Sequence, residues 1–174
     1  MGALLRPVGV VSTIFVALLL HSQTALADIV TTLDACRSVR RVTAPQSDEL
    51  LTFQCGRRFS ARDPYIALVT RVRDVEQIPR VDAAVQIYDP DQTVVETYRW
   101  AQDVELTRRL ELWHVAILPI ASSPGDLAAQ LPNLREDIVQ VKSGRAFRER
   151  LGTWTVRVTV NRQSYSLTFT LESN

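Results

Sequence analysis

The sequence predicts an all-β protein built as a two-sheet sandwich, and three observations lead to this prediction. Apolar residues alternate with polar ones over most of the chain, as they do in strands with one buried face. Turn signals rich in Pro, Asp and Asn divide the alternating runs into short segments. The chain has 174 residues, which allows one domain with a sizeable core. Short strands joined by frequent turns in a chain of this length favour a β-sandwich.

The first 27 residues predict a secretion signal. Arg6 precedes an apolar run from Val8 to Leu20, and Ala25-Leu26-Ala27 supplies the small residues that a signal peptidase requires. The run is shorter than the roughly 20 residues that a membrane-spanning helix needs. We therefore expect a mature chain, residues 28–174, that forms a single β-sandwich domain in the periplasm or outside the cell and does not span a membrane.

The mature chain has a balanced charge and two cysteines. Without Arg6 it carries 19 basic and 19 acidic residues, which argues against nucleic acid or an anionic membrane surface as a partner. In an oxidising compartment, an isolated pair such as Cys36 and Cys55 without a CxxC spacing is expected to form a disulfide. This bond would tie the N-terminal segment 28–60 together. Free catalytic thiols are the alternative, although no histidine lies near either cysteine in sequence.

The alternating runs define the expected strands. Segment 29–39 comes first, followed by 49–55 and 65–73. A hairpin is expected from 81–88 and 93–100, because Asp89-Pro90-Asp91-Gln92 between them has the chemistry of a β-turn. Segment 110–118 is a further strand, stopped by Pro119. The clearest hairpin is the last, with strands 152–160 and 165–171 around a turn at 161–163, and Trp154 is expected to anchor the core.

One stretch breaks the alternation. Its apolar residues are spaced by four and three positions, which is typical of the apolar stripe of a helix: Leu127, Leu131, Leu134, Ile138 and Val141. Because proline kinks a helix interior but is tolerated in a first turn, Pro132 divides this stripe into two helical turns. We therefore expect a short helical excursion near residues 126–142, preceded by a linker at 121–125.

Two of these segments carry a resemblance to a known family. The pattern of exported bacterial immunoglobulin-like and fibronectin-like domains is similar to two parts of this chain. The first is Tyr88-Asp-Pro-Asp-Gln-Thr-Val-Val95, and the second is Gly152–Asn161 with the strand that ends at Phe169-Thr-Leu171. The resemblance covers residues 61–171 and implies an immunoglobulin-like sandwich without implying an activity, because such sandwiches host many functions. Gln92 and Arg162 stand where glycine is usual, which predicts turns of a different type. The excursion from 126 to 150 lies outside the resemblance.

Few residues offer recognisable chemistry. His114, the one histidine of the mature chain, alternates in step with Leu112 and Ala116, which predicts a core-facing or interface imidazole whose nitrogens are satisfied. The sequence has no GxSxG, HExxH or zinc-spaced cysteine motif, so we predict no catalytic residue, metal or cofactor. Asp89 and Asp91, with Asp82 and Asp103 elsewhere, could bind calcium through oxygen ligands. The rest of a calcium loop is missing, however, and a plain β-turn explains Asp89 and Asp91 better.

The aromatic residues are the best indication of a binding surface. Tyr98 and Trp100 share one face of their strand and Trp113 lies on the next, so the three are a candidate platform for sugar rings or a flat partner, with core positions as the alternative. We expect an exported, non-enzymatic interaction module that binds another exported protein or an envelope component. The alternatives are a carbohydrate-binding or adhesive module that uses these aromatic residues, and a small hydrolase with a site assembled from scattered residues.

Overall fold

The computed structural model describes residues 31–42, 50–75, 78–104, 111–131, 139–142, 147 and 149–173. The secretion signal predicted for residues 1–27 lies outside the described residues. So do the expected second helical turn after Pro132 and the first residues of the strands expected at 29, 49 and 110.

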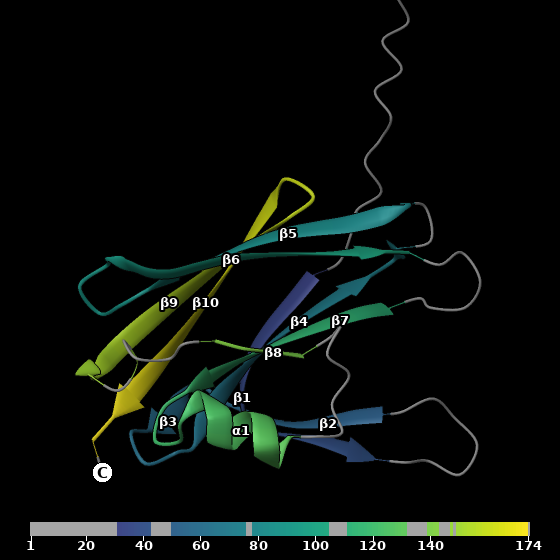
Figure 1. The fold of residues 1–174 in the computed structure, drawn as a ribbon. Helices are drawn as coiled ribbons and strands as arrows, with labels where there is room; N and C mark the ends of the chain where they lie inside the picture. Colours follow the sequence, from purple (N-terminus) through teal and green to yellow (C-terminus); the bar gives the residue numbers. More distant parts are fainter. Residues whose placement is uncertain are drawn as a thin grey trace, which may run out of the picture.

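The described residues form two five-stranded sheets and one short helix, which confirms the predicted all-β, two-sheet sandwich (Figure 1). Sheet A has the order β2-β1-β4-β7-β8, with β1 Thr31–Val42, β2 Leu50–Cys55, β4 Tyr65–Arg73, β7 Glu111–Pro119 and β8 Val139–Val141. Sheet B has the order β3-β10-β9-β5-β6, with β3 Arg58–Ser60, β5 Arg80–Tyr88, β6 Val94–Asp103, β9 Gly152–Val160 and β10 Gln163–Glu172.

The main core lies between the two sheets. In sheet B, alternate residues of β5, β9 and β10 point inward, as their period-two pattern predicts, and register aligns them across the strands. Val85, for example, lies opposite Val158 and Tyr98. Trp154 is fully buried between Phe147 and Phe169, whose ring centroids lie 4.6 Å and 6.4 Å from its own, in agreement with its predicted role as a core anchor.

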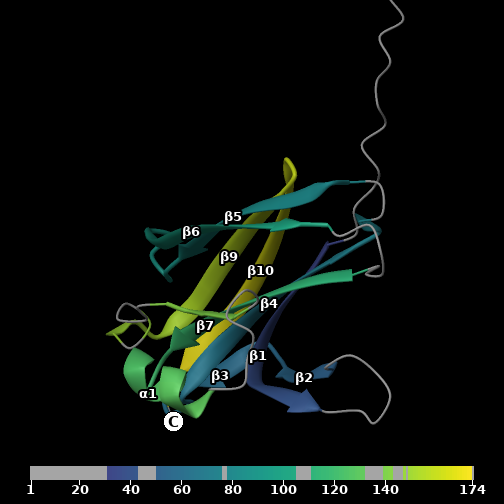
Figure 2. The same ribbon diagram turned by 45° about the vertical axis from the view of Figure 1, so that its right-hand side comes forward.

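A second, smaller apolar cluster lies on the outer face of sheet A. It forms because β4 is buried on both faces: Ile66 and Leu68 belong to the main core, whereas Ala67 and Val69 face the other way. Helix α1, Pro124–Gln130, lies on this outer side of sheet A (Figure 2). Leu127 of α1 and Cys36 of β1 are both fully buried in the cluster.

The predicted disulfide between Cys36 and Cys55 is present, and it joins two neighbouring strands of one sheet. The two residues are direct partners in the β1–β2 register, next to a bulge at Arg37. The bond therefore fixes the base of the β1–β2 hairpin, within the segment 28–60 where it was expected.

The helical excursion is only partly confirmed. Helix α1 begins inside the expected linker at 121–125, because the Ser123 side chain accepts the Asp126 N–H at 3.1 Å as an N-cap and Pro124 occupies the first turn. The helical assignment of Val141 is wrong. Residues Val139–Val141 form β8, which pairs in parallel with β7 and adds an edge strand to sheet A. Tertiary pairing thus overrides the helical spacing of these residues.

The two turns that lack the usual glycine place non-glycine residues in the left-handed region that glycine favours. Gln92 has φ 62°, and Asn161 and Arg162 have φ 43° and 77°. Positive φ at both central residues is the geometry of a type I′ hairpin turn. Asn161 offsets its cost with cross-strand bonds, because its Oδ1 accepts the Asp82 N–H at 2.9 Å and its own N–H reaches the Asp82 carbonyl at 3.0 Å.

The β5–β6 turn contains a fully buried carboxylate. Asp89 is 0% exposed, and its Oδ1 accepts the Thr93 N–H at 2.8 Å, as expected of a turn residue. Its Oδ2 forms an ion pair with Arg150, whose carbonyl accepts the Trp154 indole N–H at 3.1 Å. The turn is thereby connected to the start of β9 and to the main core.

Candidate binding surfaces

The structure does not bring Tyr98, Trp100 and Trp113 together on one surface. Tyr98 and Trp100 lie on the inner face of β6, where Trp100 is 7% exposed and belongs to the main core. Trp113 lies on the outer face of sheet A, half-buried beside the smaller cluster. The strands that carry them belong to different sheets. Tyr98 and Trp100 lie between the two sheets, whereas Trp113 lies on the far side of sheet A.

Trp113 is engaged by two neighbouring side chains. Its ring is stacked with that of Phe53 at 5.1 Å between centroids, and the Arg71 guanidinium lies 4.6 Å from the Trp113 ring. Arg71 also pairs with Asp34 and with Glu111, each at 3.7 Å. This arrangement links side chains of β1, β2, β4 and β7 on the outer face of sheet A and restricts the ring surface that a sugar could approach.

His114 occupies the core position that the sequence predicts. It is 2% exposed, and its ring stacks on Trp100 with 4.7 Å between centroids and 5° between planes. Next to it, burial raises the pKa of the Tyr98 phenol, and the nearby Glu96 carboxylate raises it further. Lys142 Nζ lies 3.8 Å from the Tyr98 ring centroid, and partial burial lowers the pKa of this ammonium group. These contacts close the side of the sandwich between β6 and β7.

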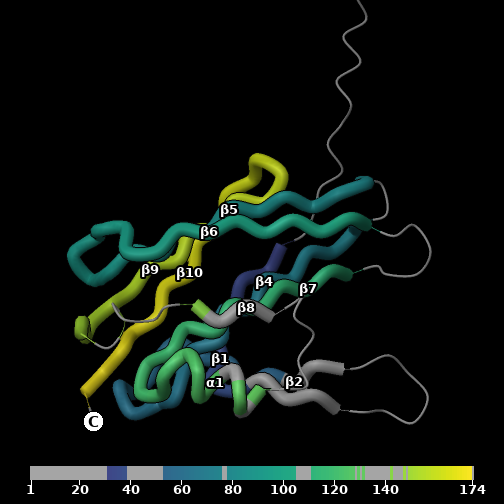
Figure 3. The backbone as a smooth tube through the Cα atoms, viewed as in Figure 1, coloured from purple at the N-terminus to yellow at the C-terminus, as the bar shows by residue number. Residues whose placement is uncertain are grey.

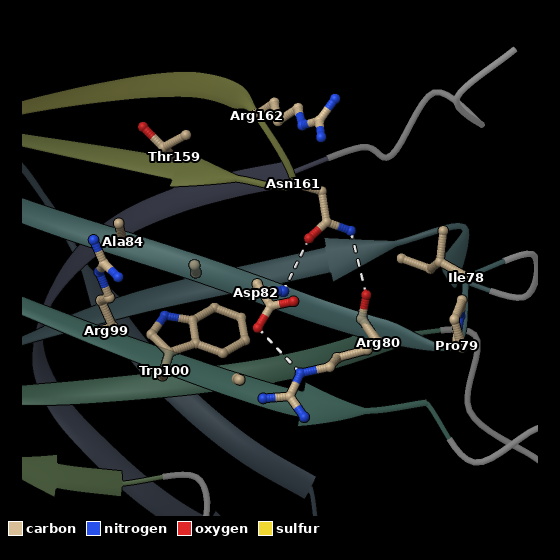
Figure 4. A pocket seen from close by; sticks show the side chains of 12 residues that line it. Ile78, Pro79, Arg80, Asp82, Ala84, Arg99, Trp100, Thr159, Asn161 and Arg162 are labelled. Carbon is tan, nitrogen blue, oxygen red and sulfur yellow. Dashed lines mark hydrogen bonds and ion pairs between the residues drawn. The ribbon is translucent and has the colours of Figure 1, made fainter. Parts of the chain in front are cut away.

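A broad groove of about 1030 Å³ lies beside the β5–β6 hairpin and the β9–β10 turn (Figure 4). Its lining includes Arg80, Arg99 and Arg162, together with Asp82 and Asn161. Arg80 is held by Asp82 at 3.1 Å and by Asp103 at 3.4 Å, and these bonds raise the pKa of its guanidinium. Figure 4 shows Arg99 and Arg162 on opposite sides of the groove, so they do not converge on one small anion.

The more distinctive surface is the backbone edge of β10. The short strand β3 pairs with β10 only from Thr170 to Glu172, so within the described residues no strand is hydrogen-bonded to the edge from Gln163 to Phe169. The β9–β10 turn projects beyond β5 at one end of the sandwich (Figure 3). Strand β1 of sheet A packs near β10, but its own ladders are with β2 and β4.

Hydrogen bonds identify which backbone groups of β10 face this edge. The Thr170 N–H donates to the Arg57 carbonyl at 2.7 Å, on the side away from β9, and the Thr168 carbonyl accepts Arg57 Nη1 at 3.2 Å on the same side. Because backbone groups alternate sides along a strand, the N–H and carbonyl groups of Ser164 and Ser166 face the open edge as well. No described residue bonds to them in the structure.

This edge also lacks the usual protection against strand pairing. Residues 163–171 contain no charged residue, no Pro and no Gly, and the β9–β10 register has no bulge. By contrast, β6, at the other edge of sheet B, carries Glu96 opposite the inward-facing Ile87 and has a bulge next to it. Inward charges and bulges are devices that block edge pairing, so the stretch of β10 that β3 leaves unpaired has fewer of these devices than β6.

The described residues contain no group of three or more His, Cys, Asp or Glu side chains that could hold a metal ion. No helix among them is long and apolar enough to cross a membrane. Comparison with known proteins gives no further indication, since no family model matches the chain and no curated protein matches it.

Proposed function

We propose that this chain is an exported, non-enzymatic interaction module, and that it binds another exported protein or an envelope component by strand addition at β10. The observation that carries the proposal is the uncharged backbone edge from Gln163 to Phe169, where the amide groups of Ser164 and Ser166 have no partner among the described residues. An exposed edge of this kind accepts an extended segment through main-chain hydrogen bonds.

The strand order supports an immunoglobulin-like arrangement of the sandwich. The runs β1-β4-β7 and β10-β9-β5-β6 have the order of strands A-B-E and G-F-C-C′ of such domains. Two features depart from that pattern. The strand beside β7 is β8, which follows β7 in the chain and is parallel to it, and the disulfide joins β1 to β2 instead of joining the two sheets. Domains of this architecture present their loops and edges to partners, and the fold itself specifies no chemistry.

The geometry gives less support to a carbohydrate-binding module. A sugar platform needs exposed aromatic ring faces. Trp100 is buried in the main core and Trp113 is stacked with Phe53 and contacted by Arg71.

The proposal is tested with a photo-crosslinking amino acid introduced at Ser164, next to the open edge, in the exported protein within its host. The matched control is Thr97, which is also exposed but lies on β6 at the opposite edge of sheet B. We expect light-dependent capture of a discrete protein or envelope species at Ser164, and weaker capture at Thr97. Absence of capture at both positions would contradict an interaction module, and equal capture would remove β10 as its binding surface.

A further inference from the structure

We infer that the segment added at β10 is an extended strand of a different protein, uncharged in its middle and acidic at both ends. This inference rests on the proposed function and specifies its partner. It follows from the charges at the two ends of the open edge, from the backbone groups between them, and from the incompatibility of a second copy with the same site.

Both ends of the open edge carry arginine. Arg162 lies in the β9–β10 turn, is exposed, and has no ion-pair partner among the described residues. At the other end, Arg57 is exposed and donates to the Thr168 carbonyl. At about 3.3 Å per residue, the backbone positions 162 and 168 lie about 20 Å apart along the strand. A strand that fills the gap thus meets a guanidinium group at each end, and a carboxylate is the complementary group there.

Between the arginines, the edge offers backbone groups and no charge. The outward side chains of Ser164, Ser166 and Thr168 are small and exposed, so they leave the adjacent backbone accessible. The inward side chains in this stretch, Tyr165 and Leu167, are half-buried and buried. The middle of the added strand therefore needs main-chain donors and acceptors and no charged side chain, because a charge placed there would lose water without gaining a partner.

A second copy of this chain fits the edge poorly. Two β10 strands paired antiparallel around Ser166 would place Arg162 of one copy opposite Thr170 of the other, because residues equally distant from the centre become partners. Thr170 lies between Arg57 and its register partner Arg58. Like charges would then meet at both ends of the interface, which disfavours this pairing.

The test uses synthetic peptides of about ten residues, a length that spans the edge at about 3.3 Å per residue. One peptide has alternating Thr and Val in its middle and Glu at both ends, and a second has Lys at both ends. Amide hydrogen exchange of the full mature protein is measured by NMR with each peptide. With the Glu-ended peptide at about ten times its Kd, exchange at the Ser164 and Ser166 amides should slow by about tenfold. The amide of Tyr165 faces β9 and serves as an internal control.

Two sets of variants define the site. Ser166→Pro removes an N–H that faces the open edge and leaves the ladder to β9 intact, so it should abolish peptide binding, whereas Ser166→Ala should retain it. The double variant Arg57→Glu and Arg162→Glu should reverse the preference, so that the Lys-ended peptide binds better. Each exposed charge pair contributes about 0.2–1 kcal/mol, so the preference should change by about 1.4- to fivefold per arginine at low salt. This second set remains informative if Ser166→Pro does not fold.

The results separate the inference from the function on which it rests. Equal protection by both peptides, or no reversal with the double variant, would overturn the acidic-ended strand. Suppose that neither peptide binds, that crosslinking at Ser164 is still observed, and that adding Ser166→Pro to the crosslinking protein abolishes it. The proposed interaction module then stands, and the inferred partner is wrong. A β10-linked dimer of the mature protein, found by sedimentation and abolished by Ser166→Pro, would instead assign the edge to a second copy.

Discussion

The buried carboxylate of Asp89 makes the stability of the β5–β6 turn depend on Arg150 in an asymmetric way. Asp89 is 0% exposed, whereas the Arg150 side chain is 45% exposed. Replacing Asp89 with Ala removes the buried charge together with its desolvation cost, and leaves an arginine that water can reach. Replacing Arg150 with Ala leaves the carboxylate buried without its cation. We therefore expect Arg150→Ala to be the more destabilising of the two substitutions.

The magnitudes follow from the contacts that each substitution removes. Asp89→Ala loses a hydrogen bond from the Thr93 N–H to a charged acceptor, worth about 1.5–3 kcal/mol, and a partly exposed ion pair that adds less than about 1 kcal/mol. Arg150→Ala should cost about 3–5 kcal/mol, the range for leaving a buried charge without its partner, because the Asp89 carboxylate is 0% exposed. Asp91 is the matched control, because it lies 3.6 Å from Arg150 in the same turn but is 81% exposed. Asp91→Ala should change stability by less than about 0.5 kcal/mol.

The assay is urea unfolding of the mature, disulfide-bonded protein at pH 7, with the double variant included. Asp89→Ala with Arg150→Ala should be less destabilising than the sum of the single variants, because the second substitution removes the charge that the first leaves unpaired. If Arg150→Ala costs no more than Asp91→Ala, or if the two single effects simply add, the reasoning about the buried carboxylate is wrong.

Four further outcomes are expected. Mass spectrometry of the unreduced protein should find no alkylatable thiol at Cys36 or Cys55, and reduction should lower stability by about 3 kcal/mol. Trp154→Ala should cost about 3–5 kcal/mol in urea unfolding, and an unchanged midpoint would contradict its place between two aromatic rings. His114→Gln should lower stability and leave partner capture at Ser164 intact. A chelator should not shift the melting curve. Loss of capture at unchanged stability would instead place His114 in a binding or catalytic site. Burial raises the pKa of Tyr98 above the ordinary 10.0. The contribution of this phenol to folding stability is therefore complete below pH 10 and declines as the pH rises above it. Thermal unfolding from pH 9 to 12 should show a smaller loss of stability at high pH for Tyr98→Phe than for the unaltered protein.

The sequence by itself determined the elements whose signal is local. The period-two alternation in 65–73, 81–88 and 152–160 depends only on which side chains face the core, and the structure has strands at these places. The pairing of Cys36 with Cys55 followed from their isolation in the chain. The core position of Trp154 followed from its place in an alternating run. Each of these features is encoded within a short segment or a single pair, so no knowledge of the sheet order was needed.

The tertiary structure decided what depends on neighbours distant in sequence. Val141 continues a helical spacing, yet it belongs to β8, Val139–Val141, because β7 offers this segment a parallel ladder. From the sequence, Tyr98, Trp100 and Trp113 are candidates for one platform, but the sheet order places Tyr98 and Trp100 between the two sheets and Trp113 on the outer face of sheet A. The open edge of β10 follows the same rule. The uncharged run 163–171 is visible in the sequence, but whether a strand covers it depends on the length of β3, and β3 reaches only Thr170.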